Sequence, residues 1–273
     1  MKSILLTFDL EEFDLPREKN VHIEEEEMYT TSITGLTNLL PILNKHNVKA
    51  TFFTTANFAK KYPKTLINLS KEHEIASHGY SHSEPVTLKN MREAKELKEE
   101  IIGKAVRGFR APRFQIGPDE IPLLDEIGFE YDSSSHPTIA PGMYNNLSQP
   151  RYPHMRGNMI ELPVTTLPLF PFLRAPNNWF MFRNIPRPYH RIYPKLNFLS
   201  SKYTMTLFHP WEFTDISKFK IPKHFTNQTG KPLIRILDSY IRLCKNNNFK
   251  FQTCEQFLKK HLIGQYLTQK ITE

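Results

Sequence analysis

The chain has 273 residues, of which 39% are hydrophobic and 23% charged, so it can bury a sizeable core and lacks the composition of a disordered protein. We expect one domain over residues 1–273, because single α/β barrels commonly run to about 250 residues. The net charge of +8 would suit a nucleic acid or an anionic surface, but mixed runs such as KNMREAKELKEE favour an ordinary solvated surface and argue against nucleic-acid binding.

No feature of the sequence predicts secretion or a membrane span. A strand-like run follows Met1 and Lys2 directly, and no uninterrupted apolar run approaches about 18 residues. Cys244 and Cys254 have no second pair, so neither a disulfide scaffold nor a zinc knuckle is expected. We therefore expect a cytoplasmic protein with buried free thiols and no transmembrane segment, whose oligomeric state is unknown.

Strand-like and helix-like segments alternate along the chain. The strand-like runs are residues 4–8, 48–55, 74–77, 105–110, 128–134, 159–164, 203–209 and 249–253. The helical patterns are residues 32–47, with a kink or a new turn expected at Pro41, and residues 86–105, 117–128, 232–247 and 254–264, with Pro118 in the first turn of the third. This alternation predicts a mostly parallel sheet, open or closed into a barrel.

The stretch from His136 to Pro194 interrupts this rhythm, because it holds 11 of the 21 prolines together with many aromatic residues. So many prolines disfavour a regular helix or an inner strand there, apart from residues 159–164. We expect residues 136–200 to form long ordered loops over one face. Such loops are usually functional, and the alternative is a simple cover for a sheet edge.

The first strand-like run ends in carboxylates that repel one another unless a cation, basic partners or solvent relieves them. These carboxylates are Asp9, Glu11, Glu12 and Asp14. After the third run, His78 and His82 are separated by three residues, and on a helical or tight turn both imidazoles can converge on one ion. Two histidines and one carboxylate, with a position left for water, form a common catalytic zinc set. The spacing alone is weak evidence for a metal site, since histidine is also a frequent structural residue.

Three further strand ends carry polar side chains, and α/β folds collect their sites at strand ends. GFRAPRF places Arg110 and Arg113 after one strand. An arginine at a strand end usually forms an ion pair on the surface, but here it can reach the carboxylates. Asp132, in YDSSS, also follows a strand-like run, and the simplest interpretation is that it favours a turn there. His209 ends the last strongly apolar strand, within LFHPWEF.

In this order the motifs resemble those of the polysaccharide deacetylase family, the NodB-type carbohydrate esterases. TFDLEEFD resembles the first motif, SHGYSH the second, and RAP, YDSS and LFHPWE the third to fifth. The resemblance covers residues 3–135 and resumes from about 203 to 213, whereas residues 136–200 give no match. It implies a distorted (β/α) barrel, which we expect to be seven-stranded, and metal-dependent removal of acyl groups from amino sugars.

The resemblance implies that Asp9 is the general base and that His78 and His82 are metal ligands. The commonest first motif has two adjacent acids, but here Leu10 follows Asp9. A subset of the family has an Asp-x-acid pattern, which makes Glu11 the carboxylate ligand and agrees with the period of two along a strand. Glu12 remains the rival ligand. Zinc is the default ion, and cobalt, nickel or manganese would also suit this ligand set.

The remaining roles follow from the same resemblance. His209 would protonate the departing amine, Arg110 would hold Asp9 ionised and aligned, and Asp132 would orient His209 and favour its cationic form. Arg113 stands where the family usually has an aromatic residue; its backbone N–H would help an oxyanion, and its charge would favour an acidic glycan. Trp211 would stack on a sugar ring or belong to the core.

The leading hypothesis is an amidase that acts on an N-acylated amino sugar within a polysaccharide or glycolipid. One alternative keeps this chemistry on a small non-carbohydrate amide. A catalytically silent glycan-binding barrel would require a lost ligand or base, and all candidate groups are present. Nucleic-acid binding would require clustered basic and aromatic residues, which only residues 183–195 approach, so no nucleic-acid partner is expected.

Overall fold

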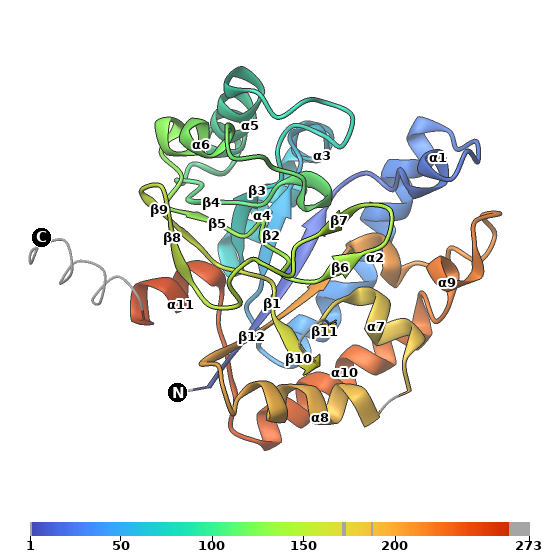
Figure 1. Cartoon of the computed structure of the whole chain (residues 1–273). Coiled ribbons are helices and arrows are strands. Elements are labelled where there is room, and N and C mark those ends of the chain that lie inside the picture. Colours follow the sequence, from blue (N-terminus) through green and yellow to red (C-terminus); the bar gives the residue numbers. More distant parts are fainter. Residues whose placement is uncertain (1, 171–172, 187, 262–273) are drawn as a thin grey trace, which may run out of the picture.

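A curled, mostly parallel sheet forms the centre of the computed structural model, which describes residues 2–170, 173–186 and 188–261 (Figure 1). Seven parallel strands follow the order β12-β1-β2-β3-β4-β5-β9. They are β1 (Ser3–Leu10), β2 (Thr51–Thr54), β3 (Glu74–Ser77), β4 (Gly108–Phe109), β5 (Tyr131–Asp132), β9 (Met159–Glu161) and β12 (Tyr203–Phe208). The α/β architecture is therefore as predicted.

Two short strands bring this sheet to nine, two more than the predicted seven. β8 (His154–Arg156) pairs with β9 in antiparallel fashion, and β13 (Lys250–Phe251) pairs with the beginning of β1. The barrel is distorted because β9 and β12 are not paired with each other in the described sheet. The side chain of Thr165 bridges the gap instead, because its Oγ1 accepts a hydrogen bond from the backbone N–H of Met205 at 2.8 Å.

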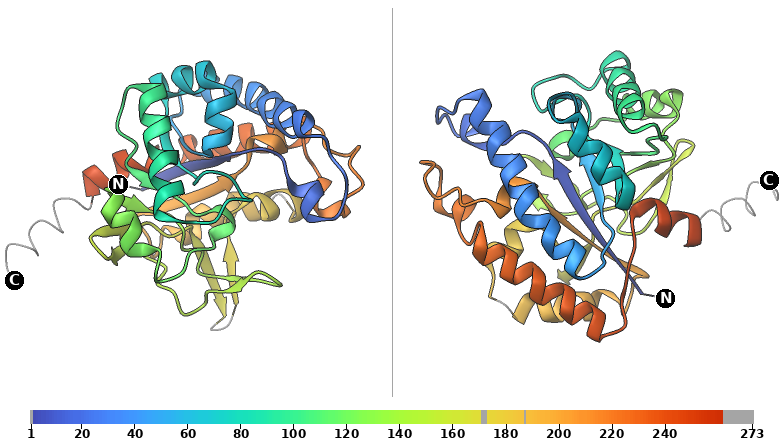
Figure 2. Two further views of the ribbon diagram at one scale, coloured as in Figure 1. Left: turned by 90° about the horizontal axis from the view of Figure 1, so that it is seen from above. Right: turned by 180° about the vertical axis from the view of Figure 1, so that it is seen from behind.

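Helices cover the outside of the sheet. They are α1 (Leu15–Glu18), α2 (Glu25–Lys45), α3 (Ala56–Lys61), α4 (Pro63–Glu72), α5 (Leu88–Ile102), α6 (Ile121–Ile127), α9 (Lys223–Thr226), α10 (Lys231–Asn246) and α11 (Cys254–His261). The view from behind shows α2 and α10 side by side (Figure 2). Their apolar sides pack on β1, all of whose residues are buried. In the described part of the chain, no helix is long and apolar enough to cross a membrane.

The predicted starts of α2 and α6 were wrong, whereas a kink at Pro41 stays a prediction. α2 starts at Glu25 and continues through Pro41 as one helix. Pro41 lies on the exposed side, where the carbonyl that lacks its usual N–H partner can face water. α6 begins at Ile121 with a proline in its first turn, later than the predicted Pro118. Residues 262–264 of the last predicted helix lie outside the described residues.

Residues 136–200 contain more regular structure than their prolines predict. They form β8 and β9 together with β6 (Ile139–Ala140), β7 (Tyr144–Asn145), β10 (Thr166–Phe170), β11 (Leu173–Pro176), α7 (Trp179–Asn184) and α8 (Pro188–Asn197). The prediction that helices are disfavoured here was wrong, for two physical reasons. Pro188 occupies a first turn, where its missing N–H costs nothing. Tertiary contacts also hold α8, because Tyr193 donates its hydroxyl to the carbonyl oxygens of Thr165 and Ala175.

Candidate active site

The carboxyl edge of the parallel strands gathers most of the predicted site residues. Asp9 lies at the end of β1 and Glu11 just beyond it, while His78, Arg110 and His209 follow β3, β4 and β12. Because these strands are parallel, their carboxyl ends meet on one edge of the sheet. Asp9, Glu11, His78 and His209 are connected by contacts of 3.9 Å or less.

Glu11, His78 and His82 form the centre of this cluster. Glu11 Oε2 lies 2.7 Å from His82 Nε2 and 3.2 Å from His78 Nε2. Despite these short distances, Glu11 Oε2 and His82 Nε2 are buried atoms without a hydrogen-bond partner in the described structure. One ligand atom from each residue lies within 4.8 Å of the others. Imidazole nitrogens and a carboxylate oxygen that converge in this way fit a divalent cation such as zinc.

The other ring nitrogens of the two histidines are held by neighbours. His78 Nδ1 lies 2.8 Å from the carbonyl oxygen of Arg110, which can only accept, so Nδ1 carries the proton and Nε2 keeps its lone pair. His82 Nδ1 lies 3.1 Å from a carboxylate oxygen of Asp14. Asp14 is therefore a positioning residue for His82. It stands in the predicted carboxylate run, but no spacing rule in the sequence pairs it with His82.

The charges of the cluster stabilise one another. Burial by itself would raise the pKa of Glu11, but the cationic forms of His82 and His209 lower this pKa well below its usual value. Burial would lower the pKa of His82, whereas Glu11 and Asp14 raise it well above its usual value. Glu11 is therefore an ionised carboxylate, and a metal ion would compete with the proton on His82.

The side chain of Glu12, the rival ligand, lies in a different environment. Its carboxylate accepts hydrogen bonds from Thr55 Oγ1 at 2.7 Å and from Asn57 Nδ2 at 3.3 Å. Burial raises the pKa of Glu12, which is not part of the imidazole cluster. Consecutive residues of an extended chain project to opposite sides, which explains why Glu11 joins the histidines and Glu12 does not.

Asp9 and Arg110 form a buried ion pair beside the cluster, which is the contact predicted for them. Arg110 Nη1 donates to Asp9 Oδ1 at 2.7 Å, and both side chains are almost completely buried. Asp9 Oδ2 lies 3.9 Å from His78 Nε2. Arg110 also donates to the carbonyl oxygen of Ser133 and lies 3.9 Å from the centre of the Phe53 ring. These contacts fix the arginine and, through it, the carboxylate of Asp9.

His209 is oriented by Glu212, and the prediction that Asp132 plays this part was wrong. His209 Nδ1 lies 2.9 Å from Glu212 Oε1, which also accepts the backbone N–H of His209 at 2.6 Å. The 3₁₀ turn η2 (Pro210–Phe213) folds Glu212 back onto the histidine. The i, i+3 spacing in HPWE was a sequence signal for this contact, and it was overlooked.

Asp132 belongs instead to a separate buried group. Its carboxylate accepts from Ser134 and from Arg156 Nη1 at 3.2 Å, and Glu161 lies against the same arginine at 3.1 Å. Burial raises the pKa of both carboxyl groups, and repulsion from Asp132 raises that of Glu161 further. No contact joins Asp132 to His209 among the described residues, so its expected catalytic role lacks structural support.

The predicted substrate contacts of Arg113 and Trp211 are also corrected. Arg113 Nη2 lies 2.5 Å from Glu18 Oε1 and 3.5 Å from Asp14 Oδ2, so its own chain offsets the charge expected to attract an acidic glycan. Trp211 is 4% exposed and stacks on the His209 ring at a centroid distance of 4.9 Å. The core alternative for Trp211 is therefore correct. An oxyanion contact from the backbone N–H of Arg113 stays a prediction.

Arg183 of α7 is a supporting residue that sequence reasoning missed. Its Nε lies 3.1 Å from Glu212 Oε2, and both side chains are fully buried. The guanidinium also lies 4.7 Å from the centre of the Trp179 ring, which packs edge-on against His209. The proline-rich segment thus holds His209 in place through Glu212 and Trp179. No motif or spacing in the sequence indicates this contact.

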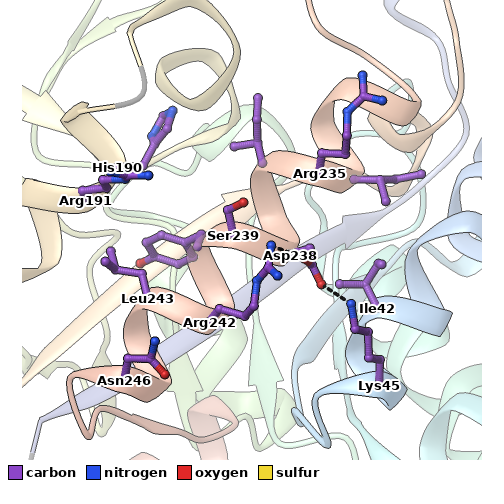
Figure 3. A pocket seen from close by; sticks show the side chains of 13 residues that line it. Ile42, Lys45, His190, Arg191, Arg235, Asp238, Ser239, Arg242, Leu243 and Asn246 are labelled. Atoms are coloured by element: carbon purple, nitrogen blue, oxygen red, sulfur yellow. Dashed lines mark hydrogen bonds and ion pairs between the residues drawn. The ribbon is translucent and has the colours of Figure 1, made fainter.

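A pocket of about 710 Å³ lies elsewhere, between α2, α8 and α10 (Figure 3). Asp238 lies between Lys45 and Arg242 there, at 2.9 Å and 2.8 Å. None of the predicted site residues lines this pocket. The chemistry argued from the strand-end cluster is therefore independent of it.

The fold and the cluster together define an α/β barrel protein with an imidazole–carboxylate group suited to a divalent cation at the carboxyl edge of its strands. The sequence model of the family described as "Polysaccharide deacetylase" matches residues 1–131. This match covers just under half of the chain, and the family is the one that the motifs resemble.

Individual proteins show the same likeness. The chain is 29% identical over 107 residues to the peptidoglycan deacetylase of Helicobacter pylori, a match that covers 37% of the chain and spans about a third (36%) of that relative's length. A putative polysaccharide deacetylase from Mycobacterium smegmatis has the same fold, with a TM-score of 0.65, 20% identity, and coverage of 98% of this chain and 91% of the other. An allantoinase also shares the fold, with a TM-score of 0.66, 15% identity, and coverage of 95% and 91%.

Proposed function

We propose that this protein is a metal-dependent hydrolase that removes an N-acyl group, most simply N-acetyl, from an amino sugar in a polysaccharide or glycolipid. The observation that carries the proposal is the convergence of Glu11, His78 and His82 beside the Asp9–Arg110 pair. In this proposal the three converging residues hold the cation, with zinc as the default. The Helicobacter pylori relative, named as a peptidoglycan deacetylase, supports a glycan substrate.

The reaction is the addition of water to an amide carbon and the loss of the amine. When bound, the cation would act as a Lewis acid that polarises the carbonyl and lowers the pKa of water toward about 7. Asp9 accepts a proton from the attacking water, and Arg110 keeps this carboxylate aligned. As the carbon–nitrogen bond breaks, His209 donates a proton to the departing amine.

The surroundings of His209 suit a proton donor. Burial would lower its pKa, but the carboxylates of Glu11 and Glu212 raise the pKa above the usual value. Glu212 also fixes the ring through Nδ1, which leaves Nε2 facing the cluster at 3.8 Å from Glu11 Oε1. His209 is therefore held in its cationic form with the donating nitrogen directed toward the reaction centre.

The decisive experiment measures bound metal by elemental analysis together with acetate release from acetylated chitooligosaccharides. We expect one metal ion per chain in the wild type, and loss of both metal and activity in His78→Ala and Glu11→Ala. Glu12→Gln is the matched control, because Glu12 contacts Thr55 and Asn57 and should leave the metal in place. Metal retained in His78→Ala would overturn the ligand assignment.

The same experiment separates the alternative substrates. The allantoinase likeness concerns the fold alone, so the fold does not select a sugar over a small amide. Bound metal without acetate release from the oligosaccharides would keep the metal site and redirect the search to another amide. Glycan binding without bound metal or hydrolysis would favour a catalytically silent barrel.

A further inference from the structure

Exposed apolar side chains are concentrated in one segment of the chain. Of the eleven large hydrophobic residues that are exposed in the described structure, ten lie between residues 139 and 199. The eleventh, Ile67, lies on α4. Scattered exposed hydrophobic residues are normal, but a concentration of them marks an interaction surface.

The positive charge is concentrated in the same segment. Residues 136–200 contain seven Lys and Arg residues but a single acidic residue, Glu161, which is a net +6 of the +8 carried by the whole chain. Glu161 and one of the cations, Arg183, are fully buried. The expectation of an evenly scattered charge therefore fails for this segment, which combines exposed apolar side chains with an excess of cations.

α8 shows this combination most clearly. Its inner face is buried and includes Tyr193, whose hydroxyl bonds to backbone carbonyls beside β10 and β11. The outer α8 face consists of Arg191, Ile192, Lys195 and Leu196 of the helix together with Leu199 of the turn that follows it, all exposed. The three aliphatic residues follow an i, i+4, i+7 spacing, and Leu199 is 81% exposed. The two cations are themselves at i and i+4, so an apolar stripe runs beside a basic stripe.

β10 and β11, which lie against α8, also carry exposed apolar residues. Leu169, Phe170 and Leu173 are exposed there, and Phe170 is 61% exposed. The view from above shows these two strands projecting from the body of the protein (Figure 2). Tyr189 of α8 donates its hydroxyl to the carbonyl oxygen of Pro176, at the end of β11. This hydrogen bond therefore joins α8 to the end of β11.

We propose that the outer α8 face, together with the exposed residues Leu169, Phe170 and Leu173 of β10 and β11, docks this protein onto an anionic membrane surface. Helices that lie in a membrane interface combine an apolar stripe with flanking Lys and Arg, and anionic lipid headgroups attract such cations. Arg191 and Lys195 have no acidic partner in the described structure, so their charges are free to meet headgroups. This inference concerns location and does not depend on the proposed reaction.

The test is co-sedimentation of the full chain with vesicles of phosphatidylcholine, alone or mixed with phosphatidylglycerol. We expect at least about tenfold stronger binding to the mixed vesicles, because each basic residue near an anionic surface contributes about fivefold. High salt should weaken this binding. Arg191→Glu/Lys195→Glu should lose the preference for anionic vesicles. Leu196→Ser/Leu199→Ser should weaken binding to them by about tenfold or more.

Lys64→Glu/Ile67→Ser on α4 is the matched control, since it makes the same kinds of change at exposed positions outside the segment. We expect it to bind vesicles like the wild type. Equal binding to both vesicle types, or equal losses in the α4 and α8 variants, would overturn the proposal. It would also be overturned if the wild type formed dimers that Leu196→Ser/Leu199→Ser dissociated, with no vesicle binding by either, because a second copy would then cover this face.

Discussion

Residues 3–135 and residues 136–200 contribute to the same site in different ways. The first region follows a regular alternation of strands and helices, and its strand ends supply the ion pair of Asp9 and the imidazole–carboxylate cluster. The second region matches no motif, yet its Arg183 supports Glu212 and, through it, His209. The reactive side chains of a site and the residues that position them therefore need not come from the same kind of segment.

The largest expected effect concerns the first region. Asp9→Asn removes the proposed general base without changing the size of the side chain, so we expect acetate release to fall by about 10²–10⁴-fold. Bound metal should stay near the wild-type level, because Asp9 is not in the Glu11–His78–His82 group. The exposed Asp119→Asn serves as the control and should keep full activity. An active Asp9→Asn enzyme would remove Asp9 from the mechanism.

A second prediction tests the support supplied by residues 136–200. Arg183→Met leaves Oε2 of the fully buried Glu212 carboxylate without the cation beside it, which should lower the free energy of unfolding by about 3–5 kcal/mol. Urea unfolding monitored by fluorescence measures the change. The exposed Arg235→Met should alter the free energy by less than about 0.5 kcal/mol. Equal effects of the two substitutions would show that the buried pair does not contribute to stability.

The double variant Arg183→Met/Glu212→Gln separates stability from chemistry. Removing both charges should recover part of the lost stability. Because Glu212 raises the pKa of His209, its loss lowers that pKa. The proposed proton donor is then deprotonated earlier as the pH rises, so the alkaline limb of the pH–activity profile should move to lower pH. Asp132→Asn should leave this limb unchanged, and a shift there would restore the original assignment of Asp132.

The smallest expected effect concerns how firmly the second region is packed. Burial lowers the pKa of His136 to about 3, and its Nδ1 lies 2.7 Å from the Tyr144 hydroxyl. The unfolded chain therefore takes up a proton below pH about 6.5 that the folded chain does not, so this histidine costs about 2 kcal/mol of stability at pH 5 relative to pH 7.

His136→Gln should remove this part of the loss of stability on acidification, as measured by urea unfolding at the two pH values. The exposed His224→Gln is the control and should leave the pH dependence as in the wild type. An unchanged pH dependence in His136→Gln would mean that this part of the segment opens easily to water.

The sequence by itself determined the α/β architecture and the set of residues at the centre of the candidate site. Hydrophobic runs locate the buried strands, and parallel strands bring their carboxyl ends to one edge whatever the loops do. Asp9, Glu11, His78 and His209 could therefore be brought together without coordinates. The three-residue separation of His78 and His82 also suggested that both imidazoles converge on one ion. The family resemblance assigned both as metal ligands and, together with the period of two along a strand, favoured Glu11 over Glu12.

Only the tertiary structure decided which partners complete these groups. Glu212 rather than Asp132 lies against His209, Trp211 is covered by the His209 ring, and the charge of Arg113 is offset by Glu18. Arg183 reaches Glu212 from a segment whose prolines disfavoured a helix. Such contacts join residues distant in sequence, or depend on the direction of a single turn. Hydrophobic periodicity carries no information about the contacts between distant residues, because it describes neighbours along the chain and not neighbours in the packed core. The i, i+3 spacing of His209 and Glu212 permits their contact, but only the observed turn shows that it forms.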